Sequence, residues 1–138
     1  MGKKQAIDRN IVDFLMQSNS LHELLSILEI ICQNLDLSYL NPKLKHFKQF
    51  QFTFFGLMLR IKSLIEFMLF KLEPIKENHP EYGEIYFRLI ELKRKINEAD
   101  RLINKKKMKE GTSKIIAISK EYSFIFDSIK SLVEKTTG

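Results

Sequence analysis

The chain has 138 residues, of which 44% are hydrophobic and 29% are charged, and it carries a formal net charge of +6 at neutral pH. This length fits one domain, residues 1–138, with a single core, and the many aliphatic and aromatic residues exclude a disordered body. One cysteine, Cys32, excludes an internal disulfide framework and a cysteine-based zinc site.

Residues 1–40 carry the pattern of two short helices. Ser18, Asn19 and Ser20 interrupt the apolar pattern, and Ser20 followed by Glu23 has the spacing of a capping box. We therefore expect a helical hairpin, with one helix at about 4–17 and a second at about 21–35.

The next segment predicts a long helix over about 42–72. Asn41 and Pro42 supply an N-cap followed by proline at the first helical position, and Pro74 ends the helix. Charged residues interrupt its apolar stretch, which is too short in uninterrupted form for a transmembrane span. No secretory leader opens the chain either, so we expect a cytoplasmic protein.

The last sixty residues predict two further long helices. Pro80 favours a helix start, so we expect one helix over about 80–106. Gly111 and Thr112 have the character of a terminator and a new cap, so the last helix is expected over about 112–135. An alternative places Gly111 inside the first turn of that helix.

Apolar residues in all these segments recur in steps of three and four, the average of 3.5 that is typical of coiled coils and helical bundles. We expect an all-α fold in which three long antiparallel helices form the core and the short N-terminal hairpin docks on them. The third segment carries a second apolar stripe, Phe52, Phe55 and Leu59, on another side. Either the hairpin covers this stripe, or it is an exposed interface for a partner or a second copy.

The sequence gives little support to catalysis. The three histidines, His22, His46 and His79, lie far apart, and none has a histidine or carboxylate at the helical spacing of a metal site. Phosphate-binding glycine loops and nucleophile elbows are absent from the sequence. Cys32 lies among apolar residues, which favours an inert thiol. We expect no enzyme activity, no cofactor and no metal.

The positive charge is clustered near particular helix ends. In an antiparallel bundle the start of the 42–72 helix and the end of the 80–106 helix lie at the same pole, and we expect Lys3, Lys4 and Lys114 nearby. The cations at this pole that we expect to bind an anion are Lys43, Lys45, Lys48, Arg101, Lys105, Lys106, Lys107 and Lys109. Positive charge at a helix N-terminus opposes the helix dipole, so an anionic partner would relieve the cost.

These features predict a non-enzymatic accessory or assembly protein whose lysine-rich end binds nucleic acid or a nucleoprotein. Tyr39, His46 and Phe52 are the aromatic candidates for stacking on bases. An acidic protein or an anionic membrane surface fits the charge equally well. The alternative is a helical protein–protein interaction module, an adaptor, chaperone-like protein or self-associating subunit, that uses the stripe of Phe52, Phe55 and Leu59.

Overall fold

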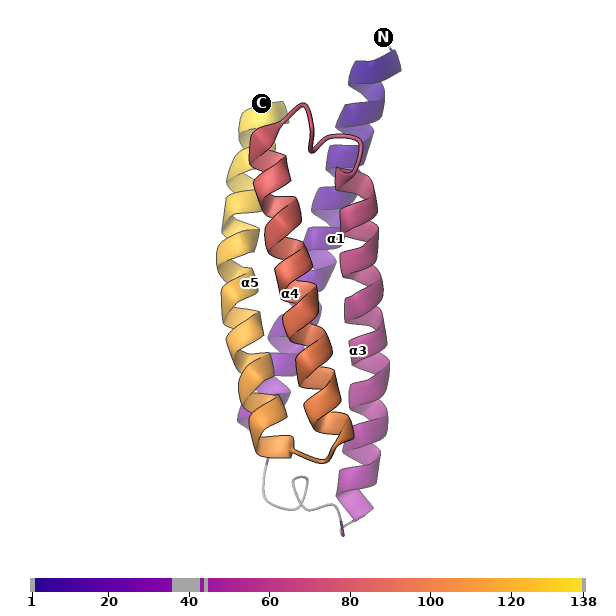
Figure 1. Cartoon of the computed structure of the whole chain (residues 1–138), viewed down its shortest axis with the longest axis vertical. Helices are drawn as coiled ribbons and strands as arrows, with labels where there is room; N and C mark the ends of the chain where they lie inside the picture. The colour runs from indigo at the N-terminus through magenta and orange to yellow at the C-terminus, as the bar shows by residue number, and fades with distance from the viewer. Residues whose placement is uncertain (1, 36–42, 44, 138) are drawn as a thin grey trace.

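The computed structural model describes the backbone of residues 2–35, 43 and 45–137, and the side chains of 9–35, 43 and 47–137. Within these ranges the chain forms four α-helices and no strand. They are α1 (Gly2–Gln33), α3 (Lys45–Leu72), α4 (Pro80–Asn104) and α5 (Met108–Thr137) (Figure 1). The expectation of an all-helical bundle is confirmed. The expected arrangement of three long helices with a short N-terminal hairpin is wrong, because the described residues form four long helices.

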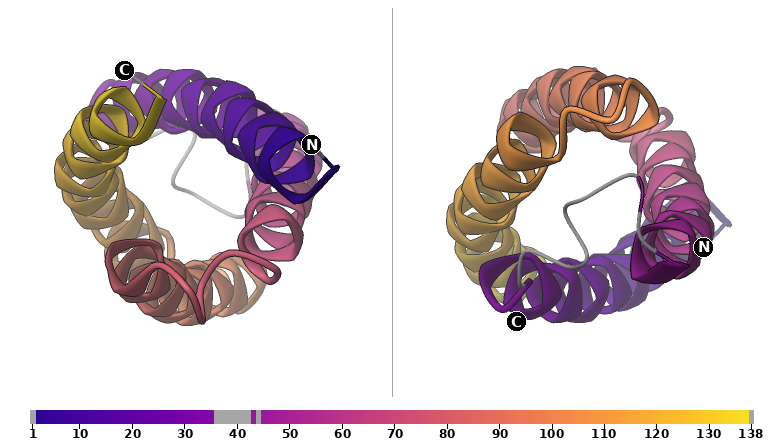
Figure 2. Two further views of the ribbon diagram at one scale, coloured as in Figure 1. Left: turned by 90° about the horizontal axis from the view of Figure 1, so that it is seen from above. Right: turned by 90° about the horizontal axis from the view of Figure 1, so that it is seen from below.

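The four helices alternate in direction and form a closed ring. In Figure 1, α1 and α4 run down the page, whereas α3 and α5 run up it. The views along the bundle axis show that α1 lies between α3 and α5, and that α4 lies between the same two helices on the opposite side (Figure 2). Each helix therefore turns one face inward, toward a shared core.

The predicted break in the first segment does not occur, because α1 runs without interruption through residues 18–20. The hydroxyl groups of Ser18 and Ser20 donate to the carbonyl oxygens of Phe14 and Met16, four residues back, at 2.7 and 3.2 Å. Each serine costs a helix only about 0.5 kcal/mol relative to alanine. Ser18 is fully buried, and packing against the neighbouring helices outweighs this small local cost.

The other boundaries differ from the prediction by a few residues. The end of α3 at Leu72 and the start of α4 at Pro80 are as expected, whereas the predicted start of α3 at residue 42 lies outside the described residues. Helix α4 ends at Asn104 instead of 106. Helix α5 begins at Met108 and ends at Thr137, so Gly111 lies in its first turn, as the alternative assignment proposed.

The turn between α4 and α5 shows why α4 ends before the lysines at 105–107 and not at Gly111. Lys106 adopts a positive φ of 64°, and its amide donates to Ile103 at 2.9 Å. The amide of Lys107 donates to the carbonyl of Leu102, also at 2.9 Å. These two bonds form a Schellman motif, in which Lys106 occupies the left-handed position that usually holds glycine.

The inward faces carry the apolar ladders that the sequence predicts. On α4 and α5 every ladder residue is buried: Tyr82, Ile85, Leu89, Leu92, Ile96, Ala99, Ile103, Ile115, Ile118, Tyr122, Ile125, Ile129 and Leu132. The second stripe on α3 is not covered, because a continuous α1 packs beside the core face of α3 and leaves no hairpin to dock elsewhere. Within the described residues, no helix combines the length and the apolar character of a membrane-spanning segment.

Candidate anion-binding end of the bundle

One end of the bundle brings together the cations that the sequence analysis selected. The start of α3, the end of α4 and the start of α5 all lie at the lower end in Figure 1. We define the lysine-rich end as the cations that these segments carry: Lys43, Lys45, Lys48, Arg101, Lys105, Lys106, Lys107 and Lys109.

Three short stretches of backbone position these residues. Lys43 precedes α3, Lys45 begins it, and Lys48 lies in its first turn. The tight turn between α4 and α5 places three consecutive lysines, 105–107, on the outside of the bundle. All members of the lysine-rich end are exposed except Lys45, whose side chain lies outside the described residues, as do Tyr39 and the side chain of His46.

Three other lysines were expected here and do not contribute free charge. Lys3 and Lys4 belong to the first turn of α1, and the start of that helix lies at the opposite end of the bundle (Figure 1). Their predicted position is therefore wrong, because it assumed a hairpin where the chain forms one helix. Lys114 lies in α5, but its Nζ atom is 2.6 Å from a carboxylate oxygen of Glu98.

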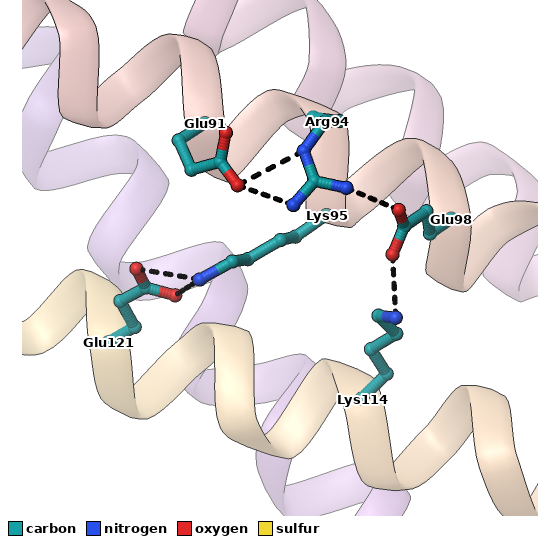
Figure 3. Close-up of polar contacts among 6 residues, drawn as sticks. All are labelled: Glu91, Arg94, Lys95, Glu98, Lys114 and Glu121. Atoms are coloured by element: carbon teal, nitrogen blue, oxygen red, sulfur yellow. Dashed lines mark hydrogen bonds and ion pairs between the residues drawn. The ribbon is translucent and has the colours of Figure 1, made fainter.

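Along the body of the bundle, most of the described cations are matched by carboxylates, and Arg9, Arg60 and Lys120 are the exceptions. Figure 3 shows this for α4 and α5, where Arg94 contacts both Glu91 and Glu98, and Lys95 donates to Glu121 at 2.9 Å. The hydrogen bond from Lys114 lowers the pKa of the Glu98 carboxyl group, and the bond from Arg94 does the same for the pKa of Glu91. These carboxylates are therefore charged well below neutral pH.

The same pairing holds between and along other helices. The body contains further ion pairs, each with a cation of α3, α4 or the turn between them: Lys62–Asp100, Lys71–Asp13, Lys76–Glu73, Arg88–Glu84 and Lys93–Glu66. At the lysine-rich end the pattern changes. Within the described part of the chain, Lys48, Lys105, Lys106, Lys107 and Lys109 have no ion-pair partner.

Helix dipoles act on this end in both directions, because α3 and α5 begin here whereas α1 and α4 end here. The first turn of α3 contains no acidic residue, and the first turn of α5 contains only Glu110. The two helix N-termini therefore add partial positive charge beside Lys48 and Lys109, and the C-termini of α1 and α4 add partial negative charge of similar size. Placing a cation at a helix N-terminus costs about 0.3–1 kcal/mol, and a bound anion would remove that cost.

The potentially reactive side chains are engaged in packing. Burial raises the pKa of the Cys32 thiol to about 12, so the reactive thiolate is scarce at neutral pH. The ring of His22 stacks on Phe126, with 4.6 Å between centroids, and His79 meets the edge of Tyr82 at 6.1 Å. Among the described residues, no three His, Cys, Asp or Glu side chains are grouped as a metal ion would require.

A second exposed surface runs along α3. Phe52, Phe55 and Leu59 are 82%, 54% and 51% exposed, and Phe67 and Phe70 continue the same face at 40% and 71%. The sequence analysis identified the first three and missed the last two. Their positions follow the helical spacing past Ser63, so the periodicity could have revealed them.

Comparison with models of protein families, with curated protein sequences and with solved structures gives no match to this chain. Its function is therefore inferred from the charge and geometry of its own residues.

Proposed function

We propose that this protein is a non-enzymatic accessory or assembly factor whose lysine-rich end binds nucleic acid or a nucleoprotein. The supporting observation is the contrast in charge pairing. Most described cations along the body are paired with carboxylates and the exceptions are scattered, whereas five exposed lysines without a partner among the described residues are gathered at one end. A phosphodiester backbone supplies anions along a line, which suits a broad surface of lysines better than a single small anion does.

Such contacts position a nucleic acid without reading its sequence. Lysine side chains reach phosphate groups, while sequence is recognised through base edges in the grooves. We therefore expect similar affinity for unrelated sequences, and an affinity that falls steeply with salt because bound counterions are released.

Fluorescence anisotropy with labelled single- and double-stranded oligonucleotides, titrated at several salt concentrations, tests the proposal. The double variant Lys48→Glu and Lys107→Glu reverses two exposed charges at the lysine-rich end. The slope of log affinity against log salt should become shallower by about one for each phosphate group that the variant no longer neutralises.

The chain offers a control of equal charge. Arg60 and Lys120 are exposed in the middle of α3 and α5, and neither has an ion-pair partner within the described residues. The double variant Arg60→Glu and Lys120→Glu changes the net charge by the same amount and should retain most of the binding. Flat salt dependence, or equal loss in both double variants, would contradict the proposal.

An acidic protein is the other partner of matching charge. Unlabelled polyglutamate, added as a competitor in the same titration, distinguishes an acidic protein from a nucleic acid as the partner. Displacement of the labelled oligonucleotide by polyglutamate at equal charge concentration would favour an acidic protein. The alternative function, a helical protein-interaction module, is supported by the exposure of Phe52, Phe55 and Leu59 on α3. It is developed below as self-association.

A further inference from the structure

The outward face of α3 carries an apolar stripe, which we define as Phe52, Phe55, Leu59, Phe67 and Phe70, with Ser63 and Glu66 exposed between its two parts. Successive members lie within about 60° of one line along the helix at 100° per residue. The stripe spans roughly 27 Å at 1.5 Å per residue. Charged residues are sparse on this face, where Glu66 is held in an ion pair with Lys93 of α4.

The stripe is large enough to form a specific interface. Its five side chains present roughly 500–600 Å² of apolar surface, judged from their exposed fractions and the size of aromatic residues. That is the upper range for the largest apolar patch on a typical monomer, about 300–600 Å². Two copies covering each other would bury about 1,100 Å² from these residues alone, close to the ~1,200 Å² at the lower end for stable complexes. Ile90 of α4, which shares a groove with Phe70, would add to this area.

Charge selects the direction in which two copies of α3 can lie together. Lys48 is exposed near the start of α3. Just after the end of α3, Glu77 is exposed beside Glu73, which is itself paired with Lys76. Parallel helices would place the lysine-rich ends of both copies side by side, with strong repulsion. Antiparallel helices place Lys48 of one copy near the acidic residues of the other, which is attractive.

One antiparallel register also explains an unusual glycine. When Phe52 faces Phe70 of the second copy, Gly56 lies opposite Glu66 of that copy, and Phe67 is one residue, about 1.5 Å, further along the helix. A Cβ atom on Gly56 would meet no atom within 4 Å, so nothing within one chain requires glycine there. Glycine destabilises the interior of a helix. A phenylalanine ring that packs over Gly56 from a second copy accounts for the missing side chain.

We propose that this protein forms an antiparallel homodimer through the α3 stripe, with Phe52 against Phe70 of the second copy and with Phe67 of the second copy beside Gly56. This proposal rests on the alternative function, a helical protein-interaction module, and names a second copy of the chain as the partner that covers the stripe. It does not depend on anion binding, which is measured with other variants and another method, so the failure of one is distinguishable from the failure of the other.

Sedimentation velocity over a hundredfold range of protein concentration tests the dimer. The mass should rise from that of one chain, 16.3 kDa, to twice that value. Phe52→Ser should weaken the dimer by about tenfold or more, as loss of a buried aromatic anchor does. Phe124→Ser is the matched control, because Phe124 is 74% exposed on α5 and lies outside the stripe. Both variants should keep the helical circular dichroism of the parent.

The orientation is tested by a spin label at Gln49→Cys, an exposed position near the start of α3. Buried Cys32 does not compete for the label. In the antiparallel register the two labels lie about 35 Å apart along the helices, whereas a parallel pair brings them within roughly 15 Å. A monomer at every concentration, equal weakening by Phe52→Ser and Phe124→Ser, or a short distance between labels would overturn the proposal.

Discussion

The hydroxyl group of Tyr122 donates a hydrogen bond of 2.8 Å to the carbonyl oxygen of Ser18, although 104 residues separate them. Tyr122 lies on α5 and Ser18 on α1, at the point where the sequence favours a break in the first helix. Nearby, the hydroxyl of Ser119 donates to the carbonyl of Leu25 at 3.3 Å. Buried bonds between α1 and α5 therefore lie at, and just after, the segment of α1 where the sequence favours a break.

Removing the Tyr122 hydroxyl should lower the free energy of unfolding. We expect Tyr122→Phe to cost about 1 kcal/mol, because one buried hydrogen bond is removed while the ring remains. Tyr82→Phe is the control: its hydroxyl bonds Thr136 at 3.1 Å near the end of α5, and a smaller decrease is expected there. Urea denaturation followed by circular dichroism measures both. Equal decreases in the free energy of unfolding would show that the bond to Ser18 stabilises the protein no more than the bond to Thr136.

Alkaline pH should destabilise the protein through buried acids, among them Tyr122 and Cys32. Burial raises the pKa of the Tyr122 hydroxyl above its ordinary value, and raises the pKa of the Cys32 thiol to about 12. In both cases the folded state holds the proton more tightly than the unfolded state. Their stabilising contribution is therefore complete below the unfolded pKa, near 9 for the thiol, and is lost as pH rises toward the folded value.

The pH prediction is checked by comparing the free energy of unfolding at pH 8 and pH 11. The decrease should be smaller in Tyr122→Phe and in Cys32→Ala than in the parent protein. Lysine deprotonation affects all three proteins alike, so it cancels in the comparison. An identical decrease in all three would contradict the assignment.

Glycine in place of Lys106 should stabilise the α4–α5 turn. The backbone of Lys106 has φ of 64°, which costs a residue with a Cβ atom about 1 kcal/mol relative to glycine. Lys105→Gly is the matched control, since it removes the same charge from a neighbour with φ of −85°. We expect the melting temperature to rise for Lys106→Gly and to fall for Lys105→Gly. A fall in both would mean that the turn tolerates lysine without strain.

If both proposals hold, the dimer should link two nucleic acid segments. Antiparallel α3 helices place the two lysine-rich ends at opposite extremities, roughly 40 Å apart at 1.5 Å per residue. Mixing the protein with two differently labelled duplexes should bring both labels into one complex, detected by fluorescence cross-correlation. Phe52→Ser should reduce the linking and keep single-duplex binding, whereas Lys48→Glu with Lys107→Glu should weaken both. If the Phe52→Ser variant still linked the two duplexes as well as the parent does, the linking would not depend on the α3 dimer.

Much of the architecture could be predicted from local patterns. Pro80 begins α4 where the sequence indicates, because a missing amide proton costs nothing in the first turn. The ladders of α4 and α5 are buried because their spacing keeps one face inward along the whole helix. The alternating helix directions, which bring the cations near Lys48 and Lys107 to one end, follow from short connections between long helices.

The amino-acid sequence by itself determined the helical class, the inward faces of α4 and α5, and the segments in which positive charge is clustered. Only the tertiary structure decided that α1 continues through Ser18, that Lys3 and Lys4 therefore lie away from the lysine-rich end, and that Phe52 remains uncovered. The reason is one of magnitude. Local preferences at residues such as Ser18 are worth a few tenths of a kcal/mol, and burial against a neighbouring helix outweighs them.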